Sequence, residues 1–226
     1  MEMEKPLRER LVDIGVELVT TEGSAPVGLR EIARRAGVSH GAPRRYFPTH
    51  QALLSAIAQR GFEDLGARCV AAIADSASPR AQLRAVARVY VGYALEHRGM
   101  FELMFRHDLL DSVANGDGER HLRKATLPLF ERVVALVAQC QAESNTAHRP
   151  GTTHGTVPTR VAVPTPTVTA AALWANLHGI AQLWAWGSLQ LAIGASPPDD
   201  TDGTPDDDLL EPLITAVLTA HLGTGA

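Results

Sequence analysis

The sequence predicts an all-α protein, and three observations support this fold class. Apolar residues recur every three or four positions along most of the chain, which is the period of helices buried on one side. Glycine, proline and helix-capping residues such as serine and threonine stand between these segments. With 226 residues, 45% of them hydrophobic, the chain can bury a substantial core as one domain or two small ones.

The first predicted helix lies close to the N-terminus and has one apolar stripe, formed by Leu7, Leu11, Ile14 and Leu18. Residues 1–10 are charged throughout and lack the apolar core of a signal peptide. Two widely separated cysteines provide no disulfide framework. We therefore expect a cytoplasmic protein.

A short basic helix is expected next, followed by a tight turn. Ile32, Ala33 and Ala36 fall on one side of this helix, and its other side is basic. Gly37 stands where helices often end in a left-handed residue, a conformation that glycine adopts at little cost. Val38 can then fill the gap between this helix and the next one.

A second short helix is predicted from His40 to Phe47, with Ser39 as its N-cap. Pro43 is tolerated only in the first turn, where few backbone N–H groups have partners, so it places the start of the helix near Ser39. Pro48 ends this helix, and Thr49 caps a longer one. The two short helices and the glycine turn between them have the spacing of a helix-turn-helix motif.

This part of the sequence resembles the TetR family of bacterial transcriptional repressors. The resemblance covers about the first sixty residues and rests on the first helix, REIARRAGVS (Arg30–Ser39) and YFPTHQALL (Tyr46–Leu54). The family usually has a bulky apolar residue in place of Pro43, tyrosine in place of Arg44, and a Lys-Glu pair at residues 50 and 51. These differences affect phosphate contacts more than the fold.

The resemblance implies that the second short helix enters the major groove of double-stranded DNA. Five arginines and one glutamate give residues 28–50 a charge of +4, whereas the whole chain carries −4. A solvated helical surface is the alternative explanation. We expect DNA contact, because Arg44 and Arg45 fall on the helix that would face the groove. The predicted DNA-binding residues are Arg30, Ser39, His40, Gly41, Arg44, Arg45, Tyr46 and His50.

Helical periodicity continues after the helix-turn-helix segment. Ser78 is a good cap and Pro79 suits the first position of a helix. Pro128 is expected to kink the helix that contains it. The predicted helices of this middle part cover residues 50–74, 79–94, 100–105 and 122–137.

Residues 143–166 differ in composition from the rest of the chain. They are rich in threonine, proline, glycine and histidine and contain few large apolar residues. Such a segment cannot bury enough surface to offset the entropy lost on ordering. We expect a flexible linker that is dispensable for DNA binding.

A helix without any charged residue is predicted from Thr167 to Gly194. A membrane span is one alternative, but polar residues interrupt the segment and no lysine or arginine flanks it closely. We expect a helix buried both in its own domain and against a second subunit. Trp174 and the Leu-His-Gly sequence at 177–179 also resemble a helix of one TetR C-terminal subgroup. The main apolar stripe of the helix predicted at 167–194 consists of Leu173, Leu177, Ile180, Trp184 and Leu191.

The last predicted helix begins near Thr204, with Pro205 at its first position and aspartates at 206–208, where the helix dipole favours anions. Apolar residues continue its inner face as far as Leu218. We expect this helix and the uncharged one to pair with their copies in a second subunit, as a four-helix interface.

The resemblance also implies a pocket for a small hydrophobic effector in the C-terminal helical domain. His178 lies on an otherwise apolar face and needs a polar partner if it is buried. The alternative is that aromatic and methionine residues at helical spacing simply fill a core. No metal motif is present, and no cofactor is expected. The predicted ligand-binding residues are Tyr90, Tyr93, Phe101, Met104, Phe105, Trp174 and His178.

The expected protein is an Ω-shaped homodimer, with a three-helix DNA-binding domain at 1–48 and a ligand-binding and dimerisation domain at 49–222. It is expected to regulate transcription as a repressor that a hydrophobic ligand releases from an inverted-repeat operator, without enzyme activity and without a membrane. A helical DNA-binding protein that lacks ligand control is one alternative. A helical enzyme is another, although the sequence contains no nucleophile–base pair or phosphate-binding glycine loop.

Overall fold

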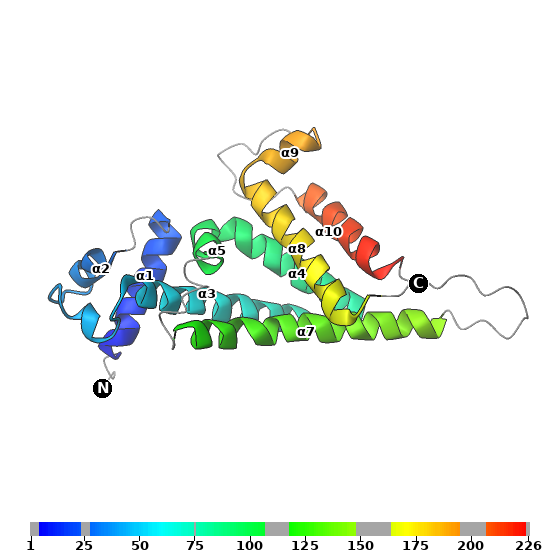
Figure 1. Cartoon of the computed structure of the whole chain (residues 1–226). Coiled ribbons are helices and arrows are strands. Elements are labelled where there is room, and N and C mark those ends of the chain that lie inside the picture. Colours follow the sequence, from blue (N-terminus) through cyan, green and yellow to red (C-terminus); the bar gives the residue numbers. More distant parts are fainter. Residues whose placement is uncertain are drawn as a thin grey trace, which may run out of the picture. The chain divides into compact units, whose positions relative to one another are not determined.

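The structure is a computed structural model that describes residues 5–23, 28–74, 76–106, 118–147, 164–194 and 207–224. Every regular element in these ranges is helical, which confirms the predicted fold class. The elements (Figure 1) are α1 (Leu7–Glu22), α2 (Leu29–Arg35), the 3₁₀ helix η1 (Pro43–Arg45), α3 (His50–Ile73), α4 (Pro79–Glu96), α5 (Arg98–Met104), α7 (Gly118–Ala147), α8 (Pro166–Ala185), α9 (Ser188–Ala192) and α10 (Asp207–Leu222).

The chain packs into two compact units. The first comprises residues 1–68 and 93–128, and the second comprises 69–92 and 129–226. These units differ from the predicted domains, 1–48 and 49–222, because α5 packs against α1 and so belongs to the same unit as the helix-turn-helix segment. Helices α3, α4 and α7 each contribute residues to both units.

The core of the first unit is formed by the predicted apolar faces. Leu11 and Leu18 of α1 are fully buried, together with Ile32 of α2 and Leu53 and Ile57 of α3. Leu7 and Ile14 of the predicted stripe are only partly buried. The apolar periodicity of the first helix therefore predicted its buried face correctly, apart from a small rotation of that face toward α2 and α3.

Two of the predicted caps are present. The Thr49 hydroxyl accepts a hydrogen bond from the Ala52 N–H at 3.0 Å and begins α3. The Ser78 hydroxyl accepts from the Ala81 N–H at 3.2 Å and begins α4, with Pro79 in the first helical position. The cap predicted at Thr204 and Pro205 lies outside the described residues.

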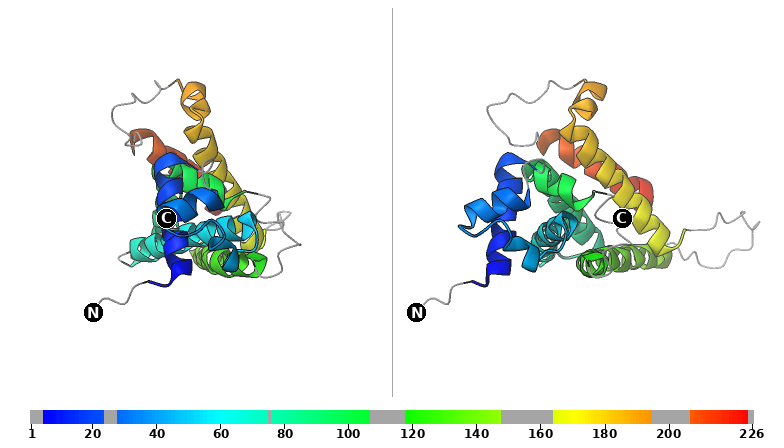
Figure 2. Two further views of the ribbon diagram at one scale, coloured as in Figure 1. Left: turned by 90° about the vertical axis from the view of Figure 1, so that its left-hand side faces the viewer. Right: turned by 60° about the vertical axis from the view of Figure 1, so that its left-hand side comes forward.

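The second unit contains α8 and α10, which lie side by side in both views (Figure 2). An Arg88–Glu211 ion pair of 2.9 Å joins α4 to α10. A hydrogen bond of 3.1 Å from the Gln141 amide to the Thr169 hydroxyl joins α7 to α8. The buried apolar residues that α8 and α10 contribute include Leu173, Leu177, Ile180, Trp184, Leu210, Ile214 and Leu218.

The helix predicted from Thr167 to Gly194 is in fact two helices. Gly187 has a φ of 72°, a left-handed conformation that ends α8 and precedes α9. Because the direction of the chain changes at this residue, Leu191 does not continue the stripe of α8 and is 74% exposed. The membrane alternative also fails, since no helix among the described residues is long and apolar enough to span a membrane.

The segment predicted as a linker is described only at its two ends. Residues 143–147 belong to the last turns of α7, and α8 begins at Pro166. The predicted linker, 143–166, is therefore too wide. Residues 143–147 contain no proline or glycine that would end the helix, so they continue α7, and residue 166 already belongs to α8. Residues 148–163 lie outside the described part of the chain.

One close backbone contact holds α5 against α1. Gly99 lies so near the end of α1 that a Cβ atom added to it would be 2.6 Å from the Val19 carbonyl oxygen and 3.0 Å from the Gly23 Cα. Both neighbours are backbone atoms, which cannot turn aside as a side chain can.

Replacing Gly99 by alanine is expected to lower the free energy of unfolding by about 1–3 kcal/mol, because the new methyl group overlaps the α1 backbone. Gly66→Ala is the matched control, since this α3 glycine has no atom within 4 Å of an added Cβ. The control is expected to stabilise the helix by up to about 1 kcal/mol. Urea unfolding followed by circular dichroism measures both; equal effects would contradict the contact.

Candidate DNA interface and effector site

The turn after α2 has the geometry predicted from Gly37. The Val38 N–H donates to the Ala33 carbonyl at 3.0 Å and the Gly37 N–H to the Arg34 carbonyl at 3.2 Å, which is the Schellman pattern of a helix end. Gly37 has a φ of 67°, so a residue with a Cβ would be strained there. The turn thus ends α2 and redirects the chain toward residues 39–47.

The second short helix is much shorter than predicted. Instead of an α-helix from His40 to Phe47, the structure has a single 3₁₀ turn, η1, at Pro43–Arg45. The reason is Pro43: an α-helix starting at Ser39 needs a bond from the N–H of residue 43 to the Ser39 carbonyl, and proline has no N–H. The Ala42 N–H instead reaches that carbonyl at 2.9 Å, in the tighter 3₁₀ pattern. The predicted Ser39 side-chain cap is accordingly replaced by Ala42 at the N-cap position, without a side-chain bond.

Buried residues fix this turn on α1. Pro43 is buried and Phe47 is 2% exposed. The Arg8 guanidinium of α1 lies 5.4 Å from the centroid of the Phe47 ring, a cation–π distance. Arg10 of α1 donates a hydrogen bond of 3.2 Å to the Ala36 carbonyl at the end of α2. The turn therefore has a defined position although it contains little regular helix.

Charge pairing reduces the predicted basic surface. Glu31 accepts hydrogen bonds from Arg34 at 2.9 Å and from Arg35 at 2.9 Å, and Arg35 also pairs with Glu22. The hydrogen bonds from Arg34 and Arg35 lower the pKa of Glu31 to about 2, so Glu31 remains ionised at physiological pH. Both arginines are thus largely neutralised by their neighbours.

The arginines that keep their charge uncompensated are the ones predicted to contact DNA. Within the part of the chain that the structure describes, no ion pair involves Arg30, Arg44 or Arg45. Tyr46 is 44% exposed even though the adjacent Phe47 is buried. All eight predicted DNA-binding residues are exposed, and they run from the start of α2 to the first residue of α3.

Three of the predicted effector residues form a hydrogen-bonded group in the second unit. The Trp174 Nε1–H of α8 donates to the Tyr90 hydroxyl of α4 at 3.0 Å. The Tyr90 oxygen lies 2.9 Å from His178 Nδ1, so the tyrosine proton can be donated to an unprotonated Nδ1. Tyr90 is buried, whereas Trp174 is 43% exposed. We call these three residues the Tyr90 group.

Burial changes the proton affinities within this group. Loss of hydration raises the pKa of the Tyr90 hydroxyl, and the hydrogen bond from Trp174 opposes this increase. Loss of hydration lowers the pKa of His178. Both effects favour neutral side chains, which agrees with a hydrogen bond from the Tyr90 hydroxyl to neutral His178.

The other four predicted effector residues belong to the first unit. Tyr93, Phe101 and Met104 are buried there. Phe105 makes an edge contact with Phe62, with ring centroids 5.5 Å apart. The seven predicted residues therefore fall into two separate groups, one in each unit, and their role in ligand binding stays a prediction.

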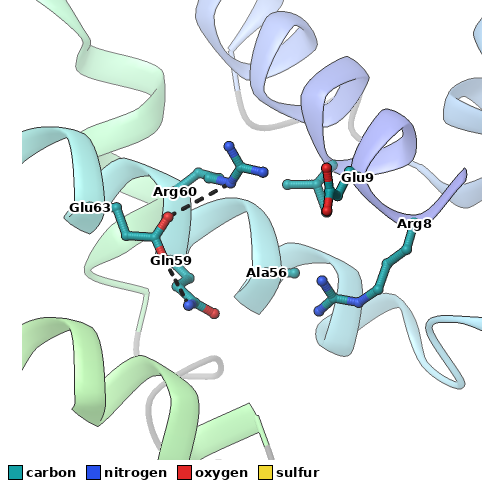
Figure 3. Close-up of a pocket in the computed structure, with 7 residues that line it drawn as sticks. Arg8, Glu9, Ala56, Gln59, Arg60 and Glu63 are labelled. Carbon is teal, nitrogen blue, oxygen red and sulfur yellow. Dashed lines mark hydrogen bonds and ion pairs between the residues drawn. The ribbon is translucent and has the colours of Figure 1, made fainter. Parts of the chain in front are cut away.

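Two cavities lined by described residues lie in the first unit. The smaller, about 240 Å³, has the side chains of Arg8 and Glu9 from α1 and of Gln59, Arg60 and Glu63 from α3 around it (Figure 3). Neither cavity is lined by a residue of the Tyr90 group.

The larger cavity, about 410 Å³, contains one residue predicted to bind ligand, Tyr93. Sequence reasoning did not predict its other ionisable side chains, Asp13, Arg60, Asp64 and His97. These positions follow no motif, and the packing of α1, α3 and the start of α5 brings them to one cavity. Among described residues, no group of three or more histidine, cysteine, aspartate or glutamate side chains could hold a metal ion.

Two family models match the chain. Residues 11–57 match the model described as bacterial regulatory proteins, tetR family. Residues 83–216, more than half of the chain, match the model of the tetracyclin repressor-like C-terminal domain. Both models describe regulators, which confirms the expectation of a non-enzymatic protein.

Related regulator sequences match a part of the chain. An uncharacterised HTH-type transcriptional regulator in the dhlA 5′ region of Xanthobacter autotrophicus is 34% identical over 94 residues, which are 39% of this chain and 45% of that protein. The chain therefore matches less than half the length of this curated relative.

Solved structures match over nearly the full length. A protein of unknown function from Rhodococcus sp. RHA1 has a TM-score of 0.67 and 27% identity, with 98% of this chain and 96% of that chain covered. AibR in complex with isovaleryl coenzyme A and operator DNA has a TM-score of 0.58 and 14% identity, with 97% and 100% covered; this likeness shows the fold alone.

The helix-turn-helix geometry, the all-helical fold and a C-terminal family model that spans more than half of the sequence lead to one conclusion. The chain belongs to the TetR family of bacterial regulatory proteins.

Proposed function

We propose that this chain is a cytoplasmic transcriptional regulator that binds an inverted-repeat DNA operator as a homodimer and is released by a small hydrophobic effector. The observation that carries the proposal is the turn at residues 39–46, which is fixed by buried neighbours and exposes Arg44 and Arg45. The shared fold with AibR, whose complex contains both operator DNA and an acyl-coenzyme A, supports it.

The short turn limits how the DNA would be contacted. A guanidinium can donate two hydrogen bonds to the O6 and N7 atoms of guanine in the major groove. Because η1 has only three residues, we expect Arg44 and Arg45 to make most of the direct base contacts. We expect exposed His40 to reach a further base edge. Phosphate contacts are assigned to Arg30, Ser39, Gly41, Tyr46 and His50.

Dimer formation is assigned to α8 and α10. The outer side of α8, which contains no charged residue, has exposed Val168 and Leu183, and Trp186 follows directly at its C-cap; their exposed fractions are 58%, 41% and 62%. Exposed apolar groups of this size on one helix are typical of a subunit interface. The outer side of α10 has small or compact residues at Pro212, Ala216 and Ala220, which allow a partner helix to approach closely.

The Tyr90 group is the proposed polar part of the effector site. Hydrophobic sites hold a few polar groups at fixed positions, and here one buried hydroxyl orients both an indole and an imidazole. The effector acts by population shift: it binds more tightly to the conformation in which the two DNA-reading turns do not match successive major grooves. The alternative, a DNA-binding protein without ligand control, lacks this response.

The DNA proposal is tested by selecting binding sites from a random pool and measuring affinity. We expect an inverted repeat, with half-sites that place the two turns about 34 Å apart. Arg44→Ala and Arg45→Ala are each expected to weaken binding by about 1–3 kcal/mol and to relax base preference or reduce the salt dependence. Arg98→Ala, which removes an α5 arginine paired with Glu102, is the control. Unchanged affinity in both turn variants would refute the assignment.

The dimer proposal is tested by Leu183→Glu, which places a charge on the outer side of α8. Burial of an unpaired carboxylate is expected to weaken dimerisation at least about tenfold. Leu127→Glu is the matched control, because this α7 leucine is also exposed, at 50% against 41% for Leu183. Analytical ultracentrifugation distinguishes monomer from dimer. A Leu183→Glu protein that dimerises as well as the control would place the interface elsewhere.

The effector proposal is tested with isovaleryl-coenzyme A and with indole as probes. At least one is expected to quench tryptophan fluorescence, raise the melting temperature and release the operator. His178→Ala should reduce all three responses while DNA binding without ligand persists. His221→Ala, which changes a histidine that contacts Asn176 on α8, should retain them. Equal responses in the two variants, or none with either probe, would contradict this assignment.

A further inference from the structure

The chain passes three times from one compact unit to the other, each time inside a helix. The crossings lie at residues 68–69 in α3, 92–93 in α4 and 128–129 in α7. A continuous helix is a stiff connector, because backbone hydrogen bonds hold every turn to the next. The freedom of the two units to move therefore depends on the residues at these three crossings.

Each crossing has a residue that weakens a helix. Gly66 of α3 lies two residues before the last residue of the first unit, and Gly92 and Pro128 are the last residues before the crossings in α4 and α7. Glycine in a helix is less stable than alanine, because it loses more conformational freedom. Proline has no N–H, so the carbonyl four residues earlier loses its helical hydrogen bond. All three connecting helices are thus weakened close to the point where they leave a unit.

Packing does not explain the choice of these three residues. A Cβ atom added to Gly66 or Gly92 would have no atom within 4 Å, and Pro128 is exposed. Gly61, also in α3, is different, because a Cβ there would lie 2.6 Å from the Met104 sulfur. Alanine would therefore fit at positions 66 and 92 and would make both helices more stable.

The attachments of α4 change from one unit to the other across Gly92. Two residues before it, the Tyr90 hydroxyl accepts a hydrogen bond from Trp174 at 3.0 Å, within the second unit. One residue after it, the Tyr93 hydroxyl donates to the Gly61 carbonyl at 3.3 Å, within the first unit. Because both side chains are held, a rotation between the units would be taken up by the α4 backbone between residues 90 and 93, where Gly92 lies.

The ion pairs next to Gly66 do not lock α3 in place. Arg68 pairs with Asp64, on the other side of the glycine, at 3.1 Å and with Glu96 of α4 at 3.3 Å. All three side chains are more than 40% exposed. Exposed pairs of this kind contribute little to stability, so they can break and form again as the helix bends.

We propose that Gly66, Gly92 and Pro128 form a hinge between the two units. Each connecting helix bends at its weakened residue, while the residues on either side keep the contacts of their own unit. The inference deepens the proposed function, because bending here would carry the response to an effector in the second unit to the DNA-binding residues of the first. That role rests on the proposed function, whereas the bending does not and can be measured without DNA or effector.

The test measures distances between two spin labels by double electron–electron resonance. The labels are attached to cysteines that replace exposed Glu17 of α1 and Ala135 of α7, one in each unit of the full chain. Cys69 and Cys140 are buried, and burial raises the pKa of both thiols, so they react slowly with the label. An excess of unlabelled protein removes distances between subunits. We expect a broader distribution than for a pair within the first unit, at Glu17 and exposed Gln51.

The stiffened protein combines Gly66→Ala, Gly92→Ala and Pro128→Ala. Helix propensity favours alanine over glycine by about fivefold in population per residue, and over proline by far more. The triple variant should therefore narrow the distribution between the units to nearly that of the pair within the first unit.

Gly179→Ala is the matched control. It makes the same change at an α8 glycine that also has no atom within 4 Å of an added Cβ, but α8 lies entirely in the second unit. The control should leave the distribution between the units as broad as in the unchanged chain. An unchanged chain whose two distributions are equally narrow, or equal widths in the triple variant and Gly179→Ala, would overturn the proposal.

Discussion

The first unit depends on how other elements are held on helix α1. The N-terminal half of α1 fixes the turn at residues 39–47, through Arg8 against the Phe47 ring and Arg10 on the Ala36 carbonyl. Its C-terminal end contacts α5 through backbone atoms at Gly99. Between these contacts, Leu11 and Leu18 are fully buried. A shift of α1 would therefore disturb both the turn and α5, because both ends of one rigid helix are engaged.

The ion pairs decide which arginines near the helix-turn-helix keep an unpaired charge. Arginine is abundant on α2, but Glu31 and Glu22 neutralise Arg34 and Arg35. These pairs are exposed, and such pairs contribute little to stability. Their consequence is for the distribution of charge: among the described residues, positive charge without an acidic partner is concentrated at Arg30, Arg44 and Arg45, which are proposed to contact DNA.

Buried polar groups are found in both units and differ in how they are satisfied. In the second unit the Tyr90 group is satisfied internally, since its hydroxyl contacts both Trp174 and His178. In the first unit His97 Nε2 is buried without a hydrogen-bond partner among the described residues. A satisfied network orients its members, so the hydroxyl of Tyr90 holds the indole and the imidazole in fixed positions.

The sequence by itself determined the helical fold, the ends of several helices and the family. Gly37, Thr49 and Ser78 act locally, through backbone conformation or a bond to a residue three positions away, so their effects could be read without a tertiary structure. Pro43 also acts locally, yet its full consequence was missed: proline at this position removes an N–H that a longer helix needs. The break at Gly187 was missed because glycine within an apolar segment is compatible with a helix until its φ is known.

Tertiary structure decided which side chains meet. Tyr90 finds Trp174 and His178 across more than eighty residues of sequence, whereas Tyr93, three residues further along the same helix, belongs to the other unit. The same holds for Asp13, Asp64 and His97, which share a cavity but no sequence pattern. Periodicity identifies the buried face of a helix, but the identity of its neighbours depends on how several helices pack, and that information is distributed over the whole chain.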